Sequence, residues 1–100
     1  MRGELNMEYK SKNEVLPLGT VVLLKDATRY LVVIGYSIVE QGKDKVWDYL
    51  GCPYPVGVIS TNSGLLFDKD QIEKIIYRGF SDEEGDEFRN QISISIGVDK

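Results

Sequence analysis

Histidine is absent from this 100-residue sequence, cysteine occurs once, and no hydrophobic run is long. Without an imidazole, no histidine-based catalytic triad, metal ligand or proton shuttle can form. The lone cysteine, Cys52, excludes an internal disulfide and a cysteine-based zinc cluster. The longest hydrophobic run, Tyr30–Ile34, is far short of the ~20 residues of a membrane span. The first residues contain no apolar block of signal-peptide type, so we expect a cytoplasmic protein that is not inserted in a membrane.

Positive charge is also scarce, since 12 basic residues face 16 acidic ones and the net charge is −4, with a pI near 4.8. Proteins bind nucleic acids by neutralising phosphates with lysine and arginine, and they dock on anionic lipid in the same way. We therefore expect no nucleic-acid partner and no docking on an anionic membrane.

The acidity is concentrated in residues 68–87, which carry eight acids against three bases, a net charge of −5. One interpretation is a patch that meets a basic partner or binds a metal ion. The other is two capped helix starts with solvated faces. Asp68 and Asp70 begin like a calcium loop, but the later glycine and the terminal glutamate are missing. We therefore predict no metal site.

The chain is long enough for one domain with one core. Hydrophobic residues make up 42% of the sequence, close to the roughly 45–50% typical of globular proteins. Residues 1–14 are polar and aperiodic, which predicts a flexible N-terminal arm. Residues 15–100 are then expected to form a single globular domain.

Short β-branched and aromatic segments predict a small sheet. The expected strands are Thr20–Lys25, Arg29–Val39, Val46–Leu50, Leu65–Phe67 and a short edge element at Val58–Ser60. Gly35, inside the second strand, predicts a bulge or bend of the kind that curls a sheet. Two prolines and two glycines predict an irregular loop over Gly51–Gly57.

The C-terminal part predicts brief helices. Asp68 can cap a short helix, with Gln71 reaching back to it. Lys74–Phe80 favours a strand, although continued helix through Tyr77 is the competing interpretation. A capping box at Ser81–Glu84 predicts a final helix to about Gln91, and Ile92–Ile96 alternates like a strand or extended tail. The expected fold is α+β, with a small curled antiparallel sheet of SH3-like barrel type and one or two short C-terminal helices.

An aromatic cluster beside the proline-rich loop is the strongest candidate for a binding site. Trp47, Tyr49 and Tyr54 lie within eight residues, next to Pro55. Aromatic residues on a rigid loop form peptide-binding grooves in small domains and dominate interface hot spots. Asp48 would lie on the rim of such a groove if its side chain points outward. The alternative is that these rings are simply core.

Catalysis finds little support in the sequence. The carboxylates have no pattern that fixes a catalytic pair, and Cys52 lacks a histidine base. We read Cys52 as a small apolar residue packed beside Pro53. The glycines are scattered and form no phosphate-binding loop. We therefore predict a protein that is not an enzyme and that uses no cofactor.

Several sequence blocks occur in the order of a known family. They are Leu16–Lys25, Tyr30–Gly35, Trp47–Gly57, Phe67–Ile72 and Ile76–Phe80. Over residues 15–80 the chain resembles a small domain-of-unknown-function family of low-GC Gram-positive bacteria. The genes of that family lie beside LXG polymorphic toxins in type VII secretion loci. The most specific block is the one around Gly51, Cys52 and Tyr54.

The resemblance implies a non-enzymatic, cytosolic adaptor or chaperone that binds the helical region of a type VII-secreted LXG toxin and supports its export. The contact residues expected from the sequence are Trp47, Asp48, Tyr49, Tyr54 and Pro55. An immunity protein that neutralises a toxin domain is the alternative, because an acidic surface suits a basic toxin. A small enzyme is a third, weaker alternative.

Overall fold

The computed structural model describes residues 14–39, 42 and 44–93. Its elements are strands β1 (Val21–Leu24), β2 (Tyr30–Val39), β3 (Val46–Pro53) and β4 (Leu65–Phe67), the 3₁₀ turn η2 (Lys69–Gln71), strand β5 (Ile72–Tyr77) and helix α1 (Glu83–Ile92). The predicted flexible arm, apart from Glu14, lies outside the described residues. So does the predicted tail beyond Ser93.

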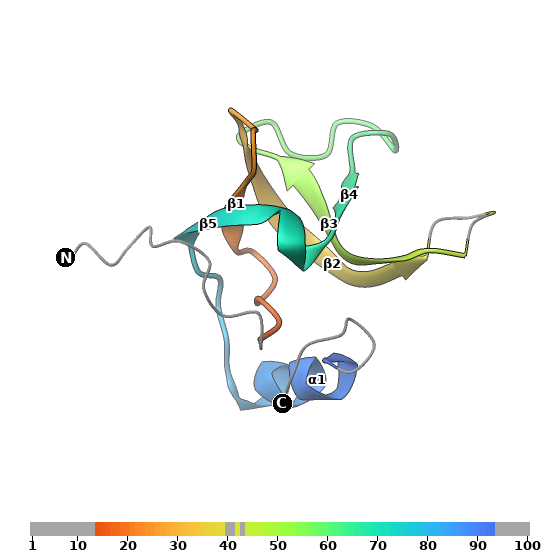
Figure 1. The fold of residues 1–100 in the computed structure, drawn as a ribbon. Helices are drawn as coiled ribbons and strands as arrows, with labels where there is room; N and C mark the ends of the chain where they lie inside the picture. The colour runs from red at the N-terminus through yellow and green to blue at the C-terminus, as the bar shows by residue number, and fades with distance from the viewer. Residues whose placement is uncertain (1–13, 40–41, 43, 94–100) are drawn as a thin grey trace.

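The five strands form one antiparallel sheet in the order β4-β3-β2-β1-β5. Figure 1 shows the sheet strongly curled, with α1 standing apart from it below. The α+β prediction is confirmed, and of the one or two C-terminal helices expected the described residues form one α-helix, α1. The barrel prediction is not, because β4 and β5 are the two edges of an open sheet and do not pair with one another.

An irregularity in β2 contributes to the curl of the sheet. Val33 pairs with Gly51 and Gly35 pairs with Leu50, so Ile34 is an extra residue in β2. A bulge, in which two residues of one strand lie opposite one residue of its partner, increases the local bend and twist of the sheet. The bulge expected at Gly35 is therefore confirmed. A tight turn at Asp26, whose φ is 64°, joins β1 to β2.

Strand β3 is longer than predicted, because Gly51, Cys52 and Pro53 continue it. The N–H of Tyr54 donates to the carbonyl of Tyr30 at 3.1 Å, so alternation turns the nitrogen of Pro53 away from β2. Pro53 also lies beyond Gly51, the last residue that β4 pairs with. A proline is tolerated there because no partner needs its missing N–H. The predicted irregular loop therefore starts at Tyr54.

Sequence analysis left Lys74–Phe80 open between a strand and continued helix. The structure has a strand there, β5, which covers Ile72–Tyr77. Gln71 reaches back as predicted, and its side chain accepts from the N–H of Asp68 at 2.8 Å. The short helix predicted after Asp68 is a single 3₁₀ turn, η2. The edge element predicted at Val58–Ser60 is wrong, because the segment pairs with no strand and leads into a turn at Ser60–Ser63, where the hydroxyl of Ser63 accepts from the N–H groups of Ile59 and Ser60.

Helix α1 begins one residue later than the capping box predicts. Asp82, not Ser81, is the N-cap, and its carboxylate accepts from the N–H of Gly85 at 2.8 Å. Gly85 therefore stands where a box would need Glu or Gln. The helix ends at Ile92, so the strand-like reading is wrong for that residue.

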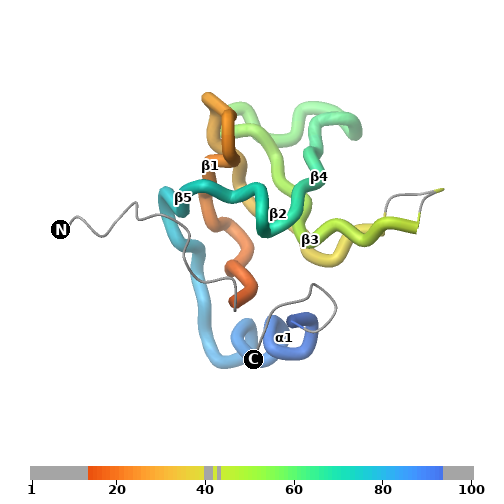
Figure 2. The backbone as a smooth tube through the Cα atoms, viewed as in Figure 1, coloured from red at the N-terminus to blue at the C-terminus, as the bar shows by residue number. Residues whose placement is uncertain are grey.

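The core lies on the inner face of the sheet and includes the chain ahead of β1. Leu16, Val22, Val33, Tyr49 and Phe67 are fully buried. Figure 2 shows the segment before β1 passing between the sheet and α1. The side chain of Ile92 packs against this core from α1. In the described part of the chain, no helix has the length and apolar character needed to cross a membrane.

Candidate functional site

The predicted aromatic cluster does not form one surface. Trp47 pairs with Ile38 near the start of β3, and the ammonium group of Lys45 lies 4.6 Å from its ring centroid. Tyr54 follows the other end of β3. Since a strand advances about 3.3 Å per residue, residues close in sequence are spread along its length. The structure therefore separates Trp47 from Tyr54 and Pro55.

Tyr49 is a core residue, with none of its surface exposed. Its ring stacks on Phe67 with centroids 5.4 Å apart. Its hydroxyl accepts from the N–H of Leu16 at 3.0 Å. The expectation that Tyr49 touches a partner is wrong for this structure, and its role is to join β3 to the chain before β1.

Asp48 is also turned inward, with 9% of its surface exposed, so it does not form the rim of a groove. Its carboxylate accepts from the N–H of Lys69 at 2.8 Å, and the carboxylate of Asp68 accepts from the N–H of Asp48 at 3.1 Å. These reciprocal bonds fasten β3 to η2. Burial raises the pKa of Asp48, and the nearby Asp68 carboxylate adds to the rise against the Lys69 hydrogen bond.

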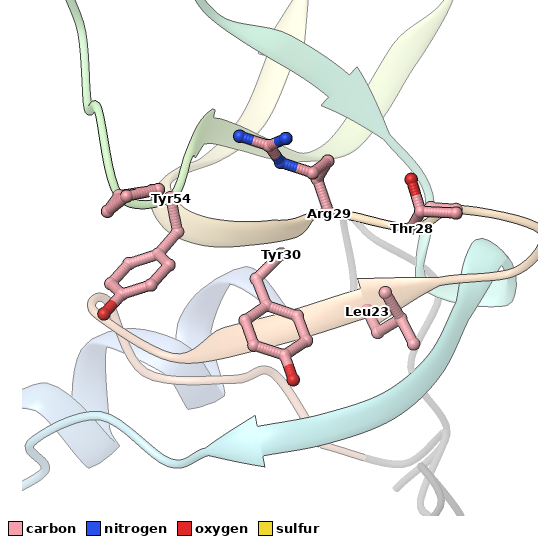
Figure 3. A pocket seen from close by; sticks show the side chains of 7 residues that line it. Leu23, Thr28, Arg29, Tyr30 and Tyr54 are labelled. Atoms are coloured by element: carbon pink, nitrogen blue, oxygen red, sulfur yellow. The ribbon is translucent and has the colours of Figure 1, made fainter.

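Tyr54 and Pro55 line a surface hollow of about 420 Å³, which we call the tyrosine hollow (Figure 3). Its other lining residues come from β1, the turn and β2: Leu23, Ala27, Thr28, Arg29 and Tyr30. The rings of Tyr30 and Tyr54 extend in the same direction, with centroids 6.3 Å apart and a tilt of 41°. Half of Tyr54 is exposed.

Strand pairing builds the tyrosine hollow. Leu31 pairs with Pro53, and the next backbone bond along joins Tyr54 to Tyr30. The tight turn at Asp26 then carries Thr28 and Arg29 to the same end of the sheet. Sequence reasoning missed Tyr30 and Arg29. Only the register of β2 with β3, which the bulge at Ile34 shifts by one residue, brings Tyr30 beside Tyr54.

The chemistry of the tyrosine hollow is that of a contact surface. Its lining offers two aromatic rings, an apolar floor and one guanidinium group. No carboxylate or thiol is among the described residues that line it. Aromatic rings give large rigid contact areas at low entropic cost, because tyrosine has only two side-chain torsions. The hollow is therefore suited to receive apolar side chains of another macromolecule.

A second hollow, of about 330 Å³, lies between α1 and the sheet, and we call it the helix groove. Its apolar lining is Leu18, Ile34, Tyr36, Phe80 and Phe88, of which all but Tyr36 are well exposed. Gly79, next to Phe80, packs closely against the chain before β1. The N–H of Gly79 donates to the Thr20 hydroxyl at 3.0 Å, and a Cβ on Gly79 would lie 2.2 Å from the carbonyl oxygen of Leu18. Sequence analysis singled out none of these residues as a site.

Cys52 is buried within β3, in keeping with its reading as a small apolar residue. Among the residues that the structure describes, no three His, Cys, Asp or Glu side chains come together as metal ligands. The acidic side chains of α1 are instead spread along an exposed helix.

Comparison with known proteins gives one match. The model of a family described as a domain of unknown function (DUF4176) matches residues 15–88. No curated protein and no solved structure matches the chain. The matched range includes the tyrosine hollow and extends to Phe88 in the helix groove. The description of the family assigns no activity to either surface.

Proposed function

The chain belongs to the family described as a domain of unknown function (DUF4176), and we propose that it is a non-enzymatic, cytosolic adaptor that binds a type VII-secreted LXG toxin and supports its export. The secretion context comes from the resemblance drawn from the sequence blocks. In this proposal the tyrosine hollow receives apolar side chains from the helical region of the toxin.

The observation that supports an interaction role is the exposure of apolar groups around Tyr54. Tyr30 and Tyr54 both expose more than a third of their surface. Val56, Val58 and Ile59 follow directly and are more than half exposed. Contiguous exposed apolar surface on a small protein marks an interaction site, because leaving it in water is unfavourable.

Co-expression with an LXG toxin encoded beside the gene tests the proposal. We expect the two proteins to co-purify. Tyr54→Ala should weaken the complex by about tenfold or more, because aromatic residues carry much of the binding energy in interfaces. The affinity of the purified pair, measured by isothermal titration calorimetry, gives the size of the loss.

Tyr77→Ala is the matched control, because Tyr77 is 65% exposed on β5 and does not line the tyrosine hollow. This variant should bind the toxin as the wild type does. Circular dichroism of both variants checks that the fold is intact. Failure of every neighbouring LXG protein to co-purify, or equal binding by the two variants, would contradict the proposal.

The immunity alternative has one observation in its favour. Helix α1 and its cap carry five exposed acids, Asp82, Glu83, Glu84, Asp86 and Glu87, which suit a basic toxin domain. Dividing the toxin distinguishes the two functions. An adaptor binds the N-terminal export region, whereas an immunity protein binds the C-terminal toxin region and abolishes its activity.

A further inference from the structure

The edge of β2 beside the helix groove has no neighbouring strand in the described part of the chain. We propose that this edge binds an extended, uncharged segment of another protein, which pairs with β2 as an added strand. The inference goes beyond the proposed function, because it concerns a different surface and does not depend on the identity of the toxin. It rests on a free strand edge, on the lack of protective charge there, and on the apolar groove next to it.

The chain before β1 leaves part of β2 without a partner on one side. β1 pairs only with the start of β2, which runs on past it (Figure 1). The last bonds on that side join Val33 to Thr20 at 2.9 Å and to Gly19 at 2.8 Å. The N–H of Thr20 also donates to the carbonyl of Pro17, and the φ of Gly19 is 88°, so a tight turn takes the preceding chain away from β2. Within the described residues, Ile34–Tyr36 therefore has β3 as its only strand partner.

This edge lacks the protection that the other edges of the sheet have. Proteins keep strand edges from pairing with other chains by short length, by bulges or by charged side chains. β4 has three residues, and β5 carries Glu73 and Lys74 and has two shifts in its register with β1. β2 has the bulge at Ile34, but from there to Val39 it contains no charged residue and no proline. Since neither short length nor charge protects it, we expect another chain to cover it.

The helix groove gives an added strand apolar contacts beside the free edge. Ile34–Tyr36 forms the β2 side of the groove. Leu18 and Phe88, each 51% exposed, and Phe80, 80% exposed, also line it. Side chains of a strand alternate between its two faces, so every second residue of the occupant would lie over the groove. Pairing with β2 satisfies the backbone of the occupant, and its apolar side chains remove these groups from water.

The lining of the groove favours neither sign of charge. Asp82 and Arg89 are its charged residues, one of each sign. Arg89 is ion-paired with Asp86, and the carboxylate of Asp82 caps α1 by accepting from the N–H of Gly85. A charged side chain directed into the groove would therefore lose water without gaining a free partner of opposite charge. This is why we specify an uncharged occupant.

Three short, end-capped peptides test the inference at concentrations where each is monomeric. The first alternates isoleucine with serine, and we expect it to bind and to slow hydrogen exchange at the amides of Ile34–Tyr36. The second has the same side chains on an N-methylated backbone, and it should bind at least about tenfold more weakly because it cannot donate to β2. The third has lysine in place of isoleucine and should also bind at least about tenfold more weakly.

Variants locate the site. Phe80→Ala should weaken the isoleucine–serine peptide by about tenfold, as expected for an aromatic anchor. Ile59→Ala, at an exposed apolar residue outside the groove, should leave binding unchanged. Ile34→Lys places a charge on the free edge, as many natural edges do, and should abolish binding. Tyr77→Lys, at an exposed position of β5, is its control. Circular dichroism checks that each variant keeps the fold.

Several results would overturn the inference. These are equal binding of the first peptide and its N-methylated form, no binding of either, protection centred away from Ile34–Tyr36, or a Phe80→Ala effect no larger than that of Ile59→Ala. A dimer of the protein alone that Ile34→Lys dissolves would assign the edge to a second copy. Peptide binding that appears only after Ile94→Lys and Ile96→Lys would assign the edge to the C-terminal end of this chain. Because no peptide contains toxin sequence, failure here leaves the proposed function untouched, and failure of toxin binding leaves the edge untouched.

Discussion

Leu16 is held by two tyrosine hydroxyls, one at its N–H and one at its C=O. Tyr49 accepts from the N–H at 3.0 Å, and Tyr36 donates to the carbonyl at 2.7 Å. The Leu16 side chain is fully buried, so water cannot replace these bonds easily. The aromatic rings of β2 and β3 therefore do more than fill the core. They also satisfy the backbone of the segment that closes it.

Tyr49→Phe is expected to lower the free energy of unfolding by about 1–3 kcal/mol, because it keeps the ring but leaves a buried N–H without its acceptor. The stacking on Phe67 should survive, so the fold should remain. Urea denaturation followed by circular dichroism measures the loss. Tyr77→Phe, at an exposed tyrosine, is the control. Equal midpoints for the two variants would show that the hydroxyl of Tyr49 adds nothing.

The Asp48–Asp68 pair makes a second prediction at the scale of residues. The pKa of Asp48 is raised above its ordinary 3.8, chiefly by burial, so the folded state holds this proton more tightly than the unfolded chain does. The contribution of Asp48 to the free energy of unfolding is therefore largest below its ordinary pKa of 3.8. It falls as the pH rises from 3.8 through the raised pKa of the folded state. Asp48→Asn keeps an oxygen that can accept from Lys69 and removes this dependence.

Comparing unfolding midpoints of the wild type and Asp48→Asn from pH 4 to pH 7 measures the effect. We expect the stability of the variant relative to the wild type to increase over that interval, since only the wild type pays for a buried charge. Asp44→Asn, in the exposed loop before β3, should track the wild type. A constant difference between Asp48→Asn and the wild type across the interval would refute the prediction.

At the scale of elements, local sequence chemistry foretold most of the strands but not where they end, and it added a wrong edge element at Val58–Ser60. β-Branched and aromatic runs identified β1, β2 and β4 and favoured a strand over a helix for the segment of β5, and Gly35 marked the bulge. Proline and glycine suggested that β3 stops at Leu50, yet its register with β2 carries it on to Pro53. Strand pairing is a long-range interaction, so the proline preference of an isolated segment could not decide this boundary.

The candidate site was foretold in part for the same reason. Tyr54 and Pro55, two of the residues that sequence analysis singled out, line the tyrosine hollow, whereas Tyr30 and Arg29 join them only through the pairing of β2 with β3. Trp47 was grouped with Tyr54 because the two are close along the chain, but an extended strand holds them apart. The helix groove joins elements distant in the sequence, and no local pattern marks it.

At the scale of the whole molecule, stability is unevenly distributed between the sheet and α1. The sheet and the chain before it supply the fully buried side chains, whereas no residue of α1 is buried. Ile92, which packs against the core, and Phe88, whose ring lies beside that of Tyr36, make apolar contacts between the helix and the rest. An element with so little buried area is expected to open without unfolding of the sheet. Such opening would also remove one wall of the helix groove.

Native-state hydrogen exchange tests this uneven stability. Leu24→Val should cost about 1 kcal/mol, because it removes a buried methylene at the end of β1 far from α1 in Figure 1. It should speed exchange at the Val33 amide of β2, which donates to the carbonyl of Thr20 just before β1, by roughly fivefold. The amides of α1 should keep their wild-type rates, since a local opening leaves Leu24 buried both before and after.

Asp82→Ala gives the complementary result. Losing the N-cap costs about 1 kcal/mol, and because the cap is broken in both local and global opening, the amides of α1 and of the sheet should all exchange faster. The two variants together separate a helix that opens by itself from one that opens only with the whole molecule. If Leu24→Val speeds α1 and Val33 equally, the protein unfolds as one cooperative unit and the independent opening of α1 is wrong.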